Sequence, residues 1–97
     1  MSAVGRAVTG PYTVTIEGVT EPATFKQLCD ALAALWKSIR VLPLGWDQAS
    51  AYERFLVGAD APANVVRLLE ERSPRPLEVT FTMDGRTHVV RVVASGH

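Results

Sequence analysis

The stretch "LEVTFTMDGRTHVVRVV", residues 77–93, decides the fold because two alternating runs meet at Asp84-Gly85. An Asp-Gly pair between such runs is a strong signal for a two-residue β-hairpin turn. Pairing Met83 with Arg86 sets the register of the two strands. One face of the hairpin is then mainly apolar and is expected to face the core: Leu77, Val79, Phe81, Met83, His88, Val90 and Val92.

A hairpin alone is marginally stable in water and needs further strands. The segment "PYTVTIEG", residues 11–18, alternates apolar and polar side chains and is rich in β-branched residues. Pro11 and Gly18 mark its two ends. This pattern predicts a strand with one buried face that pairs with one strand of the hairpin.

Residues 21–40, "EPATFKQLCDALAALWKSIR", have the three- and four-residue spacing of an amphipathic helix. Thr24 and Gln27 fit a capping box at its start. The apolar positions predict an inward stripe made of Phe25, Leu28, Cys29, Leu32, Leu35, Trp36 and Ile39.

Two shorter helices are predicted after residue 46. Asp47 is the expected cap of "QASAYERFLV", residues 48–57, in which Ala49, Tyr52 and Leu56 point inward. Residues 63–72, "ANVVRLLEER", follow Pro62, which suits a first helical turn.

These elements predict an α+β domain with the order β-α-α-α-β-β. The sheet has three strands, with four as the alternative, and the helices pack on one face. We expect residues 1–10 to form a flexible arm, residues 11–94 the single domain and residues 95–97 a tail. Because a small sheet leaves two unpaired edges, a symmetric homodimer is also expected.

Charge and hydropathy limit the range of partners. The chain has ten basic and ten acidic residues among 97, so it lacks the surplus of positive charge typical of nucleic-acid or anionic-membrane binding. No apolar run approaches the ~20 residues of a membrane span, and the N-terminus does not resemble a signal peptide. One cysteine cannot form an internal disulfide, which favours the cytoplasm. The excess of Arg over Lys, with abundant Ala and Val, suggests a bacterial or phage genome.

The sequence contains few residues that suit catalysis. Cys29 is expected to be buried and inert rather than nucleophilic. His88 is expected to stack on Phe81 at the rim of the core, because a catalytic site needs several convergent groups. The carboxylates are scattered, and the glycines occur singly rather than in a phosphate-binding loop. We therefore predict no catalytic residue, no metal site and no cofactor.

The connection "VLPLGW", residues 41–46, is unusual because it is apolar although it lies between two predicted helices. In one interpretation Val41, Leu42 and Leu44 close the end of the sheet and Trp46 packs between the two helices. Trp46 is predicted to remain exposed and to anchor another protein, since Trp and Tyr are favoured at interfaces. The predicted contact surface consists of Leu44, Trp46, Tyr52 and Phe55.

The function predicted from these features is that of a small non-enzymatic protein-interaction module, such as an adaptor, an inhibitor or an immunity-type protein of a bacterium or phage. The alternative is a small-ligand-binding protein or a small enzyme with a cleft around His88, Arg86 and Tyr52. A cavity of several hundred Å³ at His88 would favour the alternative. An apolar patch at Trp46 would favour the interaction module.

Overall fold

The computed structural model describes residues 9–73 and 75–96. Most of the predicted N-terminal arm, residues 1–8, lies outside the described residues, as does His97 of the predicted tail. Along the chain the elements are β1 (Thr9–Ile16), β2 (Ala23–Phe25), α1 (Leu28–Ile39), α2 (Trp46–Leu56), α3 (Ala61–Arg72), β3 (Leu77–Met83) and β4 (Arg86–Gly96).

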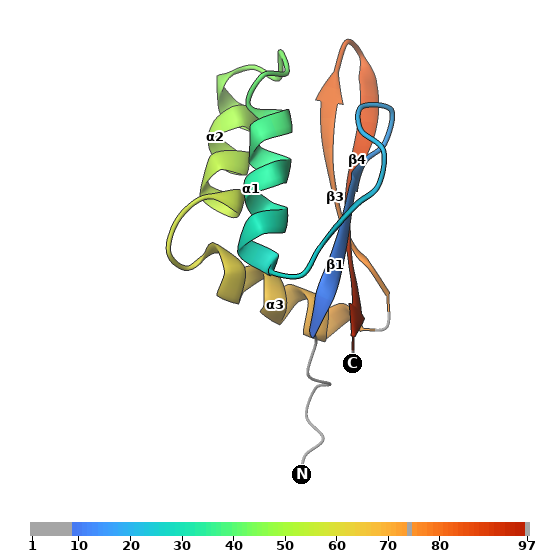
Figure 1. Cartoon of the computed structure of the whole chain (residues 1–97). Helices are drawn as coiled ribbons and strands as arrows, with labels where there is room; N and C mark the ends of the chain where they lie inside the picture. The colour runs from blue at the N-terminus through green and yellow to red at the C-terminus, as the bar shows by residue number, and fades with distance from the viewer. Residues whose placement is uncertain (1–8, 74, 97) are drawn as a thin grey trace.

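The fold is α+β, as predicted, with the three helices on one face of an antiparallel sheet (Figure 1). The sheet has four strands in the order β2-β1-β4-β3. The larger of the two predicted sheet sizes is therefore the observed one. None of the helices in the described part of the chain is long and apolar enough to span a bilayer.

The C-terminal hairpin has the predicted register. Met83 pairs with Arg86 and Phe81 pairs with His88. Asp84 and Gly85 both have positive φ, 54° and 74°, as a primed two-residue turn requires. β1 then pairs with β4 rather than with β3, which makes β4 a central strand.

The strand β2 replaces the predicted first turn of the long helix. Thr24 pairs with Thr13 of β1, and their hydroxyl oxygens lie 2.9 Å apart, so Thr24 is not a helix cap. α1 begins only at Leu28, after an extended Gln27 whose side chain makes no capping hydrogen bond. The predicted capping box was wrong because pairing with β1 gives this segment interstrand hydrogen bonds that a helical turn would forgo.

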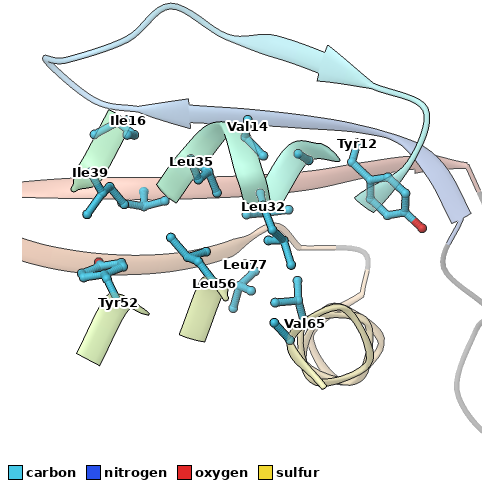
Figure 2. Packing of buried hydrophobic residues seen from close by; sticks show 14 of the residues in the cluster. Tyr12, Val14, Ile16, Leu32, Leu35, Ile39, Tyr52, Leu56, Val65 and Leu77 are labelled. Carbon is cyan, nitrogen blue, oxygen red and sulfur yellow. The ribbon is translucent and has the colours of Figure 1, made fainter. Parts of the chain in front are cut away.

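The core lies between the sheet and the helices (Figure 2). Alternate residues of β1 face it, as predicted, and α1 crosses these residues with a stripe of buried leucines and Ile39. Phe81, Val90 and Val92 of the hairpin are almost completely buried. The inward faces predicted for β1 and for the hairpin are thus confirmed.

The prediction that Cys29 is buried was wrong, because its side chain is exposed. The buried stripe of α1 is centred on Leu28, Leu32 and Leu35 and includes Ala31 on the flank opposite Cys29. Phe25 lies in β2, and the six other positions of the predicted stripe span a wider arc of α1 than the side that is buried. Because Ala31 is among the buried residues of α1, the core-facing side of the helix is rotated away from Cys29, which lies on the outer side.

α2 is positioned against the edge strand β3 by two of its own side chains. The amide of Gln48 accepts a hydrogen bond from the backbone N–H of Thr82 and donates one to the carbonyl of Thr82, both at 2.8 Å. The hydroxyl of Tyr52 donates to the carbonyl of Thr80 at 3.0 Å. α2 thereby satisfies backbone groups that would otherwise lie free at the edge of the sheet.

Candidate functional site

The apolar connection between α1 and α2 is divided between the core and the surface. Leu44 is buried and helps to close the core, whereas Trp46 is 80 % exposed and Val41 is 73 % exposed. Exposed indole rings are rare in small domains, since a large aromatic side chain contributes much of the available burial. We call the pair Val41 and Trp46 the tip surface.

Gly45 fixes how Trp46 is presented. It is the N-cap of α2 and has φ of 85°, a region that favours glycine. The helix therefore begins at Trp46, one residue before the predicted cap Asp47. Asp47 lies in the first turn, where its negative charge interacts favourably with the helix dipole. The expectation that Asp47 caps the helix was wrong because Gly45 already turns the chain.

The remaining residues of the predicted contact surface lie deeper in the fold. Tyr52 is buried, and its ring meets those of Phe55 and Phe81 edge-on at centroid distances of 6.4 and 6.0 Å. Phe55 is half-buried beside it. Tyr52 and Leu44 are therefore covered by the fold itself, and only Trp46 of the predicted set is freely available to a partner.

Burial also changes the chemistry of Tyr52. It raises the pKa of the phenol from 10.0 to about 12, because the phenolate would lose hydration inside the core. The hydroxyl remains protonated at neutral pH and serves as a hydrogen-bond donor to Thr80. This is a structural role.

His88 has the rim position predicted for it. Its ring stacks on Phe81 with centroids 5.2 Å apart and planes inclined by 15°. Nδ1 lies 3.1 Å from the carbonyl oxygen of Glu17, which can only accept, so Nδ1 carries a proton and donates it. A Cβ added at Gly18 would come within 3.3 Å of this ring. The imidazole is thus held by Phe81 of β3 and by Glu17 and Gly18 in the turn that follows β1.

The alternative cleft does not bring its three residues together. A hollow of about 230 Å³ at Tyr52 is lined by Phe55, Val79 and Thr80, among others, but not by His88 or Arg86. Arg86 is exposed beside the hairpin turn. Phe81 separates the rings of Tyr52 and His88, since it contacts both. This arrangement suits packing better than ligand binding.

A second hollow, which the sequence analysis missed, runs along the outer side of α1. Its volume is about 410 Å³, and it lies between α1 and the segment that joins α2 to α3. We call it the α1 groove and define it by the residues that shape it: Cys29, Leu32, Trp36, Lys37, Arg40, Leu56 and Val57. The available signal was the spacing of Cys29, Trp36 and Arg40, which places them on one stripe of a helix.

The described residues contain no group of three or more His, Cys, Asp or Glu side chains that could hold a metal ion. Comparison with protein-family models, with curated proteins and with solved structures found no match. The function must therefore be argued from the geometry of this chain.

Proposed function

We propose that this protein is a small protein-interaction module of a bacterium or phage that uses Trp46 as its principal anchor. The observation that carries the proposal is the 80 % exposure of this indole at the start of α2. Burying such a side chain in a partner would release a large apolar area from water. An adaptor, an inhibitor or an immunity-type protein would act by occupying a surface in this way.

The scaffold supports this use of Trp46. Leu44 anchors the connection in the core, and Gly45 directs the indole outward at the start of α2. The Gln48 amide also donates to the carbonyl of Leu44 at 2.8 Å, which ties the first turn of α2 to the connection. A side chain held on a fixed backbone loses less entropy on binding than one on a mobile loop.

A cytoplasmic location is part of the proposal. Cys29 is exposed, and an exposed thiol persists in a reducing compartment but is readily oxidised outside it. No enzymatic role is proposed, because the contacts of His88 and Tyr52 account for both side chains as structural.

The experiment that tests the proposal compares the wild type with Trp46→Ala. Tagged forms of both are used for affinity capture from the source organism, and each captured protein is then purified and its binding measured. We expect Trp46→Ala to weaken binding by about 2 kcal/mol or more, the usual threshold for an interface hot spot. Stability should change by less than about 1 kcal/mol, since the side chain is exposed.

Glu71→Ala provides the control, because Glu71 is exposed on α3 and is not part of the tip surface. It should capture the same partner with unchanged affinity. Equal binding by the wild type and by Trp46→Ala would show that Trp46 is not the anchor. Loss of the cooperative unfolding transition in Trp46→Ala would instead show that Trp46 belongs to the core.

A further inference from the structure

The α1 groove combines an apolar floor with a basic rim. Leu32 and Leu56 are buried at its base, and Trp36 is half-buried along one wall. Val57, on the opposite side, is 44 % exposed. The groove therefore leaves apolar surface open to water at a concave site, which is the usual form of a site for an apolar ligand group.

Lys37 and Arg40 give the groove its charge. They lie three residues apart at the C-terminal end of α1, and no Asp or Glu lines the groove. Neither forms an ion pair with any described residue. A complementary ligand would thus place negative charge at this end and apolar side chains along the rest.

The walls also restrict the backbone conformation of the ligand. One wall is the α1 helix, whose backbone groups in the lining turns bond within the helix. An extended peptide would find few backbone partners there, whereas a helix satisfies its own backbone groups and needs only side-chain contacts. From Cys29 to Arg40 the groove wall extends about 16 Å, which matches three turns of a helix.

We propose that the α1 groove binds an amphipathic helix of a partner protein whose first turn is acidic. Acidic residues are most favourable at the N-terminus of a helix. Placing that end at Lys37 and Arg40 makes the bound helix antiparallel to α1, with its apolar stripe over Trp36 and Val57. This site shares no residue with the tip surface, and the proposal does not depend on the role proposed for Trp46.

The test begins with a random library of 16-residue peptides displayed for selection on the wild-type protein. We expect the enriched peptides to carry Asp or Glu in their first turn, followed by apolar residues at three- and four-residue spacings. The double variant Lys37→Glu/Arg40→Glu should bind an enriched synthetic peptide about tenfold more weakly. Both side chains are exposed, so the variant should fold.

Two controls make the test specific. Arg67→Glu/Arg86→Glu changes the net charge equally at exposed positions outside the groove and should bind the peptide like the wild type. Trp46→Ala should also bind it normally, which separates this proposal from the proposed function. If both charge-reversal variants bind the peptide equally weakly, the loss of binding depends only on net charge, and the proposal is overturned.

Cys29 reports directly on occupancy. It is the only cysteine and lines the groove, so a maleimide reagent labels a single exposed site. A saturating enriched peptide should slow this labelling at least about tenfold, as expected when one bound complex shields the thiol. Unchanged labelling under saturation would place the peptide elsewhere and contradict the proposal, as would a selection that yields no enriched sequence.

Discussion

At the scale of single residues, Tyr52 shows how one side chain can serve two layers of the fold. Its ring packs between Phe55 and Phe81, and its hydroxyl reaches the backbone of Thr80 in β3. Position 52 was correctly predicted to point inward from its helical spacing. Its hydrogen bond was not predictable, because it joins segments that are 28 residues apart.

The raised pKa of Tyr52 predicts a loss of stability in alkali. The folded state holds the phenolic proton to about pH 12, whereas an unfolded tyrosine loses it near pH 10.0. The contribution of the protonated Tyr52 to the free energy of unfolding is therefore fully present below pH 10. It is lost as the pH rises toward 12, and the loss reaches roughly 2 kcal/mol at pH 12. Denaturant unfolding of the wild type at several pH values measures it.

Tyr52→Phe is the matched control for this titration. It should cost about 1 kcal/mol at pH 8, because the carbonyl of Thr80 loses its donor. It should also remove the Tyr52 part of the alkaline dependence, so that the stability difference between the two proteins reverses near pH 12. Parallel pH profiles for the two proteins would contradict the raised pKa.

At the scale of elements, the contact between α2 and β3 is the least expected feature. The Gln48 amide bonds Thr82 much as a neighbouring strand would, with one accepted and one donated hydrogen bond. Nothing in the sequence pattern around Gln48 indicates this contact. Its role appears only when the helix lies beside the sheet edge.

Gln48→Ala should therefore affect both stability and association. We expect a loss of about 1–3 kcal/mol in the free energy of unfolding, since backbone groups of Thr82 and Leu44 lose their partners. The exposed β3 edge should also increase self-association. Denaturant unfolding and light scattering measure the two effects.

Glu53→Ala, at an exposed position of the same helix, should change the free energy of unfolding by at most about 0.5 kcal/mol. It should leave self-association unchanged. If Gln48→Ala is as stable and as monodisperse as this control, the amide does not protect the edge.

At the scale of the whole molecule, the edges of the sheet bear on the predicted homodimer. At one edge β2 is only three residues long, and at the other β3 is bonded by α2 at Thr80 and Thr82. Both features disfavour pairing of two sheets edge to edge. No helix or strand among the described residues covers the face turned away from the three helices (Figure 1). It carries the half-buried Val89 and Val93, since the alternate residues Val90 and Val92 of β4 face the core.

The homodimer stays a prediction, and we expect it to form through this open face. Light scattering at high micromolar concentration should give about twice the monomer mass of 10.5 kDa. Val93→Lys should restore the monomer mass without loss of the fold, because a charge at the centre of a symmetric contact meets its own copy. Glu71→Lys, on the helical side, should remain dimeric. A monomer mass for the wild type would refute the prediction.

The sequence by itself determined the hairpin, because its register depends on the local turn chemistry of Asp84-Gly85 and on strict alternation. It also predicted the inward face of β1 and the exposure of Trp46, whereas Leu44, which was assigned to the contact surface, is buried. Each of these features follows from neighbouring residues, whose geometry is set by the local period of the chain.

Only the tertiary structure decided that residues 23–25 form a strand, that Cys29 is exposed and that Gln48 bonds the edge strand β3. The segment that could begin a helix became a strand because β1 offered it a hydrogen-bonding partner. Cys29 is exposed because the packing of α1 on the sheet selected one part of a wide apolar arc. These outcomes depend on which surfaces meet across the core, and the order of residues along the chain does not specify that contact.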